Sequence, residues 1–238
     1  MSVKYKTEAL VFKKEDWSEA DRIFSIFTYD FGKVQVIGKA IRKITSKLRG
    51  GLEIFSFCEI EFIQGKNRKI LTDAVFLDKF KSIPQIPEKL AVAYKISDIL
   101  DNFIKGEEND EKIWGLLVDI FEKLDTHFSK NFNYQLIYFY FFWNFISTLG
   151  HCPELSKCAA CQQKLNPNDL YFSNKEGGVI CRNCYIANTN AIKITSDAVK
   201  ILRLILQKDW EVLLKLKIET SCQKDLEEIL KNYYDYFI

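Results

Sequence analysis

Two pairs of cysteines constrain the fold of this chain more than any other feature of its sequence. Cys158 and Cys161 form the first pair, and Cys181 and Cys184 form the second pair after an interval of nineteen residues. Two such pairs can place four sulfur atoms at the corners of a tetrahedron, which is the geometry of structural Zn²⁺ sites. The spacing also falls within the range typical of these sites. The sequence therefore predicts one structural zinc ion held by these four cysteines.

The segment between the two pairs is rich in residues that favour turns. It contains Asn166-Pro167-Asn168-Asp169 near its start and Gly177-Gly178 near its end. This composition is typical of a β-ribbon with little hydrophobic core of its own, which needs a metal ion to hold its shape. Redox-active cysteine pairs and four unligated thiols are the alternatives. A redox pair normally lies at a strand-to-helix junction, which this turn-rich segment fits poorly.

Other cysteines and a histidine bear on the ligand set. His151 and Cys152 lie close to the first pair in sequence, and either could replace one of its sulfurs as a ligand. Four thiolate ligands leave no coordination position for water, so we expect a structural ion and no catalytic one. Cys58 lies in an apolar stretch and Cys222 at the start of a helical pattern, and we expect both to pack in the core.

The first 80 residues have the alternating pattern of short β-strands. Strands are expected over residues 3–13, 22–28, 33–39, 52–63 and 70–77, and turn residues separate them. Five short strands without a long helix predict a small closed barrel. A sandwich of two sheets is the alternative, although five strands are few for one.

The pattern becomes helical after residues 82–87, a candidate linker with two prolines. Helical patterns begin at residue 88 and continue over 113–124 and 131–149. A fourth helix is expected to end at residue 206 and to be capped by Thr195 or Ser196. A last helix is expected over 226–237, after a cap at Thr220 or Ser221. The helix over 131–149 is apolar on almost every side, so we expect it to be central and buried. Gly150 is expected to end it. The fold class is α+β and multidomain, with a five-stranded barrel followed by an all-helical domain that contains the zinc ribbon.

Composition places the chain among globular proteins. Hydrophobic residues make up 47% of the sequence, which excludes an intrinsically disordered chain. The formal net charge of +2 is too small to indicate a partner by itself. The most apolar stretch, residues 136–145, is about half of the roughly 20 residues that a membrane span needs. Without a signal segment, and with an odd number of cysteines, we expect a cytoplasmic protein with metal-bound thiolates.

A basic stretch follows the third expected strand. It contains six cations and no acidic residue: Lys33, Lys39, Arg42, Lys43, Lys47 and Arg49. A basic loop beside a small barrel is suited to follow a phosphate backbone, and binding of that kind weakens as salt rises. A solvated loop that only aids solubility is an equally good interpretation of the charge.

Aromatic residues near this stretch offer a second feature of nucleic-acid binding. Trp17, Tyr29 and Phe31 lie beside polar residues and turns, so they are the best candidates for surface platforms on which bases stack. The sequence contains no phosphate-binding glycine loop, no paired carboxylates and only two histidines. We therefore expect no catalytic centre, and a zinc-dependent nucleic-acid hydrolase is the least favoured interpretation.

At this level of detail the sequence resembles the RecO family of bacterial DNA repair proteins. The resemblance rests on residues 7–12 and 17–22, on 31–33, 38–43, 46–49 and 52–55, and on 149–150, 153–155, 158–161, 172–173, 176–178 and 181–184. These segments occur in the family's order and span most of the chain. The family usually has glycine at the position of Ala40 and a small residue at the position of Cys152.

The resemblance implies a fold and a function. It implies an OB-fold (an oligonucleotide-binding barrel) over residues 1–80 and a helical domain over 81–238 with a zinc ribbon at 152–190. It further implies binding of single- and double-stranded DNA, annealing of complementary strands, and help in loading the RecA recombinase onto DNA coated by single-strand-binding protein, together with RecR. The six cations listed above become the DNA contacts, and the four paired cysteines become the zinc ligands.

A different class of function is the main alternative. The ribbon and the helices would form a protein-interaction scaffold, and the basic loop would not touch DNA. The resemblance favours the DNA repair protein, located in the bacterial cytoplasm at the nucleoid, without enzymatic activity and without contact with a membrane.

Overall fold

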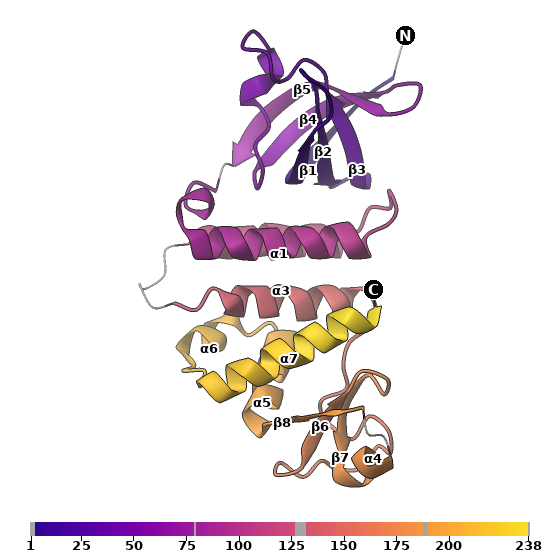
Figure 1. Ribbon diagram of the computed structural model, residues 1–238, viewed down its shortest axis with the longest axis vertical. Coiled ribbons are helices and arrows are strands. Elements are labelled where there is room, and N and C mark those ends of the chain that lie inside the picture. The colour runs from indigo at the N-terminus through magenta and orange to yellow at the C-terminus, as the bar shows by residue number, and fades with distance from the viewer. Residues whose placement is uncertain (1–2, 79, 127–131, 188–189, 238) are drawn as a thin grey trace. The chain divides into compact units, whose positions relative to one another are not determined.

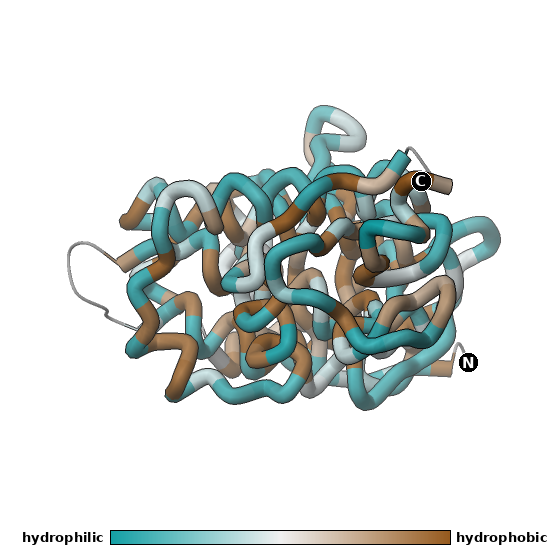
Figure 2. The backbone as a smooth tube through the Cα atoms, turned by 90° about the horizontal axis from the view of Figure 1, so that it is seen from below, coloured by the Kyte–Doolittle hydropathy of each residue, from teal (hydrophilic) through white to brown (hydrophobic). Residues whose placement is uncertain are grey.

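The computed structural model describes residues 3–78, 80–126, 132–187 and 190–237. Contacts between Cα atoms divide the chain into two compact units, Met1–Tyr134 and Gln135–Ile238. The domain boundary predicted at residue 80 lies inside the first of these units, because two helices pack with the barrel. Figure 2 shows hydrophobic and hydrophilic stretches alternating along the backbone.

The first unit is built on a closed five-stranded barrel. Its strands are β1 (Lys4–Asp16), β2 (Arg22–Thr28), β3 (Gly32–Gly38), β4 (Phe57–Gln64) and β5 (Lys69–Asp78). They follow the order β1-β2-β3-β5-β4 around the barrel (Figure 1). All neighbours are antiparallel except β3 and β5, which are parallel. Five strands in this Greek-key order form an OB-fold, which confirms the predicted barrel.

Alternating side chains of the strands fill the barrel. The buried cluster contains Ala9, Val11, Phe24, Ile26, Val34, Val36, Ile41, Leu52, Cys58, Ile60, Phe62 and Leu71. Cys58 is therefore a packing residue, as predicted. The strand predicted from residue 52 begins only at Phe57, so the first five residues of that prediction are wrong. Phe55 has a φ of 58°, which interrupts the extended backbone there.

Two helices close the lower end of the barrel in Figure 1. A 3₁₀ turn, η2 (Ile83–Gln85), leads into α1 (Pro87–Phe103), and α2 (Glu111–Asp125) follows. Ser82 and Ile83, in the predicted linker, are buried. A cluster of aromatic rings joins the helices to the barrel: Phe55, Phe57, Phe80, Trp114 and Phe121. Inside this contact the Ser97 hydroxyl donates to the carbonyl oxygen of Phe12 at 2.6 Å.

Asp101 is the electrostatic link between α1 and the barrel. Its carboxylate accepts from Lys13 on β1 at 2.8 Å and from Lys33 on β3 at 2.7 Å. Burial opposes ionisation of Asp101, but the hydrogen bonds from the two lysines outweigh it and lower the pKa of the carboxyl. The charges of Lys13 and Lys33 therefore help to hold α1 in place.

The second unit combines helices with a small three-stranded sheet. The helices are α3 (Gln135–Thr148), α4 (Arg182–Ala187), α5 (Ser196–Leu206), α6 (Trp210–Lys215) and α7 (Thr220–Phe237), and the strands are β6 (Leu170–Ser173), β7 (Gly178–Cys181) and β8 (Ile192–Ile194). β6 lies between β7 and β8, and both pairings are antiparallel. The predicted cap of α5 is confirmed, since the Thr195 hydroxyl accepts from the Ala198 backbone at 3.2 Å.

The aromatic helix α3 is the centre of this unit. Ten of its residues, from Leu136 to Ile146, are buried, as the sequence predicted. The predicted start at residue 131 lies outside the described residues. Gly150 adopts a φ of 91° after the helix, and the His151 amide donates to the carbonyl oxygen of Ile146 at 3.0 Å, which confirms the predicted end. Within the described ranges no helix combines the length and the apolarity that a membrane crossing requires.

Lys89 is a buried cation in the first unit. Its ammonium donates to the Ser82 hydroxyl at 2.6 Å and to the carbonyl oxygens of Asp125 and Thr126 at 3.1 and 2.9 Å. Burial lowers the pKa of Lys89, and the charge of Asp125 partly offsets that effect. The two carbonyl groups end α2, so this lysine joins the start of α1 to the end of α2.

We expect the substitution Asp101→Asn to reduce stability by about 1 kcal/mol at pH 7. Because the pKa of Asp101 is lower in the folded state, its contribution is present above the unfolded value and is lost as pH falls below about 4. Urea unfolding at pH 7 and at pH 3 measures this difference. Asp98→Asn, an exposed change on the same helix, is the control. An equal effect at both pH values would contradict the ion-pair account.

Replacing Lys89 by methionine keeps an unbranched side chain of similar size but removes its three donors. The buried Ser82 hydroxyl and the two carbonyl groups at the end of α2 then lose a donor, so we expect a loss of about 2–4 kcal/mol in the free energy of unfolding. Lys112→Met, on the exposed first turn of α2, should change stability by less than about 0.5 kcal/mol. Chemical denaturation of both variants tests the role of Lys89, which is refuted if the two lose equal stability.

Candidate metal centre and nucleic-acid interface

The four paired cysteines converge from three local structures. Cys158 and Cys161 lie on a turn before β6, Cys181 ends β7, and Cys184 lies on α4. Their sulfur atoms all lie within 4.8 Å of one another. The Cys161 and Cys181 sulfurs are 3.8 Å apart, and a tetrahedral ion with Zn–S bonds of about 2.3 Å requires about this separation. The cluster therefore has the dimensions of a four-thiolate metal site.

Backbone pairing holds the two cysteine turns together. The Ala159 amide donates to the carbonyl oxygen of Val179 at 2.8 Å, next to the strand that leads to Cys181. Glu154 pairs with Gly178, where a Cβ atom would lie 2.2 Å from the Glu154 carbonyl oxygen. Only glycine allows this approach, which gives a physical reason for the Gly177-Gly178 pair noted in the sequence.

A thin layer of side chains surrounds the sulfurs. Tyr171 of β6 and Tyr185 of α4 stack at 3.8 Å between ring centroids, with an interplanar angle of 6°. Among the described residues, the buried members of the cluster at the sulfurs are Cys158, Tyr171, Ile180 and Ala191, and partly buried residues pack against them. Because this cluster is small, cross-linking through the cysteines would help to hold the ribbon.

The thiols have unequal affinities for protons. Burial opposes ionisation of Cys158, but backbone amides of Cys161 and Cys181 donate to its sulfur and bring its pKa to about 6. Hydrogen bonding with Cys161 and burial raise the pKa of Cys184 to about 12. Four neighbouring thiolates repel one another, so their joint ionisation requires a cation among them.

The other described cysteines and His151 are not part of this cluster. His151 lies against Phe237 at 4.4 Å between ring centroids, with the rings tilted by 44°, and the exposed Cys152 is not among the four converging sulfurs. Cys222 is buried, as predicted, and its burial raises the pKa of its thiol to about 11. The four-sulfur set predicted from the spacing is therefore the set that the fold brings together.

The basic loop, residues 39–50, is anchored at several points. Ile41 and Leu52 belong to the buried cluster of the barrel, and Leu48 packs against it. Ala40 has a φ of 51°, a conformation that favours glycine, and its amide donates to the Asp21 carboxylate at 2.7 Å. These contacts fix the backbone, so the charged side chains of the loop project from a defined surface.

The six predicted DNA-contact residues have three different environments. Lys39, Lys43 and Lys47 are exposed, and in the described part of the chain their side chains form no ion pair. Arg42 binds Asp16 at 3.3 Å and the Ser18 carbonyl oxygen at 3.2 Å. Lys33 is bound to Asp101, as described above. The Arg49 side chain lies outside the described residues.

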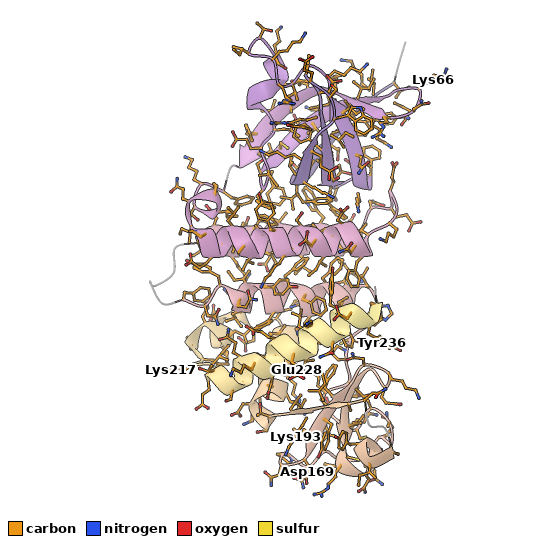
Figure 3. The ribbon with its side chains drawn as sticks, in the orientation of Figure 1. Lys66, Asp169, Lys193, Lys217, Glu228 and Tyr236 are labelled. Atoms are coloured by element: carbon orange, nitrogen blue, oxygen red, sulfur yellow. The ribbon has the colours of Figure 1, made fainter. Side chains whose placement is uncertain are left out.

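Two further cations of the barrel did not stand out in the sequence. Lys66 and Arg68 lie on the turn between β4 and β5, and Figure 3 shows Lys66 at its tip, pointing away from the barrel. The Arg68 guanidinium lies 4.2 Å from the ring centroid of Trp17. Trp17 is 55% exposed and Tyr29 is 41% exposed, whereas Phe31 packs against the barrel core. Trp17 is therefore the most accessible of the three predicted aromatic platforms.

Comparison with known proteins identifies the family. The models for the N-terminal and C-terminal regions of recombination protein O match residues 1–80 and 85–238. A DNA repair protein RecO from Dehalococcoides mccartyi is 34% identical over 223 residues, covering 94% of this chain and 86% of that protein. A RecO from Roseiflexus is 26% identical over 237 residues, covering 98% and 81%. The chain belongs to the RecO family of DNA repair proteins.

Proposed function

We propose that this protein is a recombination mediator that binds single- and double-stranded DNA through its basic loop. It promotes annealing of complementary strands and helps to load a recombinase in recombinational repair. The observation that carries the proposal is a group of three exposed lysines, Lys39, Lys43 and Lys47, on a backbone anchored to the barrel; among the described residues they form no ion pair. Membership in a DNA repair family supports the choice of DNA as ligand.

The mechanism is electrostatic. Ammonium groups that meet phosphates release condensed counterions, which favours binding at low salt. Arg42 mainly holds the basic loop in position, because its guanidinium is already bound to Asp16 and to the Ser18 carbonyl oxygen. Phosphates held along the loop leave the bases available for pairing with a second strand. No covalent bond changes in this process, so the protein is not an enzyme.

Partners follow from the same role. The protein works with RecR on DNA coated by single-strand-binding protein, and it acts on RecA indirectly. This places it in the bacterial cytoplasm at the nucleoid. Family membership supports DNA and other repair proteins as partners, and the individual partners belong to the proposal.

The metal ion is zinc, and its role is structural. Cys158, Cys161, Cys181 and Cys184 hold it, and their sulfur separations fit a tetrahedral ion. With all four positions taken by sulfur, the ion has no position for a reacting water. Its contribution is to cross-link a ribbon whose hydrophobic cluster at the sulfurs is small.

The triple variant Lys39→Ala, Lys43→Ala, Lys47→Ala tests the DNA interface. The slope of log affinity against log salt for a single strand should become less steep by about 2, since each lost phosphate contact removes about 0.7. Titration of a labelled oligonucleotide at several salt concentrations measures it. Lys193, Lys217 and Lys231, which are exposed on the second unit, provide a control with the same change of charge.

The outcome separates two classes of function. A steep salt dependence that the loop variant loses and the control variant keeps supports the recombination mediator. Binding that is unchanged in the loop variant, or no binding by the unmodified protein, contradicts it and favours a protein-interaction scaffold. Incubation of the DNA with the protein and divalent cations should yield no cleavage products, and cleavage would contradict the non-enzymatic role.

Metal analysis tests the zinc site. The protein should contain one zinc ion per chain, and Cys181→Ser should lose it and become sensitive to proteolysis within residues 152–190. Cys152→Ser, which removes an exposed sulfur outside the cluster, should keep full occupancy. Retention of zinc by the Cys181 variant, or its loss from the Cys152 variant, would show that the ligand set is different.

A further inference from the structure

We propose that Trp17 is a stacking platform for one unpaired base of single-stranded DNA, and that it gives the protein a preference for single strands. The inference rests on the proposed DNA-binding function and adds to it a residue that contacts bases. Three observations carry it: the presentation of the Trp17 ring, the cation that lies over it, and the polar groove beside it.

The loop between β1 and β2 presents Trp17 in a fixed position. The Trp17 amide donates to the carbonyl oxygen of Asp21 at 3.1 Å, and the Asp21 amide donates to the Ser18 hydroxyl at 3.2 Å. Trp17 is 55% exposed, whereas Trp114 is 9% exposed and Trp143 is fully buried. An indole that is held by its backbone and open to solvent offers a flat surface to a base at little cost in entropy.

Arg68 covers part of this indole from the turn between β4 and β5. Its guanidinium lies 4.2 Å from the Trp17 ring centroid, within the range of a cation–π interaction. The turn itself is closed by the Gly65 amide, which donates to the Arg68 carbonyl oxygen at 2.9 Å. Arg68 is exposed and forms no ion pair within the described ranges. It can therefore orient the ring and still attract the phosphate of a stacked nucleotide.

A groove of about 590 Å³ runs from this turn along β3. Amide side chains line it at Gln35, Gln64 and Asn67, and cations line it at Arg68 and Lys105. Amides offer both donors and acceptors to base edges, and cations attract phosphates. The only acidic side chain in the lining, Glu107, is already bound by Lys69 at 2.6 Å. This surface suits an extended polyanion with exposed bases.

Contacts also connect the platform to the basic loop. Arg42 of that loop binds Asp16 and the carbonyl oxygen of Ser18, the two residues on either side of Trp17. A strand whose phosphates lie on the loop lysines can therefore place a base at the indole. In a duplex the bases are stacked inside and cannot reach the ring without unpairing. Stacking on Trp17 thus favours single strands over duplexes.

The experiment compares Trp17→Ala with Tyr236→Ala, which removes an aromatic ring of equal exposure, 55%, from the second unit (Figure 3). Binding of oligothymidine and of a duplex of equal length is measured at several salt concentrations. Trp17→Ala should weaken single-strand binding about 5- to 150-fold, the range expected for one stacked base. Its salt slope should stay unchanged, because stacking releases no counterions. Duplex binding and the Tyr236 variant should match the unmodified protein.

Fluorescence provides a second measurement that does not depend on affinity. Oligothymidine should quench tryptophan emission in the unmodified protein and not in Trp17→Phe. The proposal is overturned if single-strand binding is unaffected in Trp17→Ala, if duplex binding falls equally, or if quenching persists in Trp17→Phe. Loss of binding only in the triple lysine variant would overturn the platform and leave the proposed function intact. Unchanged binding in the lysine variant would overturn the proposed function instead.

Discussion

The short parallel pairing of β3 with β5 closes the barrel, and the surface that we propose for nucleic acid depends on it. Only two residue pairs form it, Val36 with Lys69 and Ile37 with Ile70. This pairing brings the turn between β4 and β5 to β3, where Arg68 reaches Trp17. Because the pairing is so short, the first half of β3 is left to line an open groove. The same closure that removes the edges of the sheet therefore creates the surface that can receive a strand.

The fold divides its cations between structure and surface. Lys13 and Lys33 hold α1 through their ion pairs with Asp101. Lys89 donates to a carbonyl oxygen at the C-terminal end of α2. Arg42 binds Asp16 and so holds the loop that carries Trp17. A cation that is bound to a carboxylate must give up that partner to gain a phosphate, which cancels much of the Coulomb energy. Among the described residues, Lys39, Lys43 and Lys47 have no such partner to lose. In the proposed interface, each of these three lysines would therefore contribute more to binding than Lys33 or Arg42.

The sequence predicted most of what depends on local pattern. Alternation located the barrel strands, and the cysteine spacing located the sulfur cluster. The sequence could not show that Lys33 is bound to a carboxylate while Lys39 is exposed, because the partner of Lys33 lies 68 residues away. Nor could it pair Trp17 with Arg68, since this contact arises from closure of the barrel. The strand expected at residue 52 fails for a related reason: the Phe55 ring packs against Phe121 of α2, and this tertiary contact accompanies a backbone conformation that alternation does not encode.

The hydrophobic cluster at the sulfurs and the cluster inside the barrel are separate sets of residues, and they belong to different compact units. A metal ion at the cysteines would cross-link the ribbon, whose described hydrophobic cluster at the sulfurs is small. The contacts described for Ile41, Arg42 and Asp16, which shape the basic loop, lie within the barrel unit. The surface that we propose for DNA is therefore built from contacts other than those that join the cysteine turns.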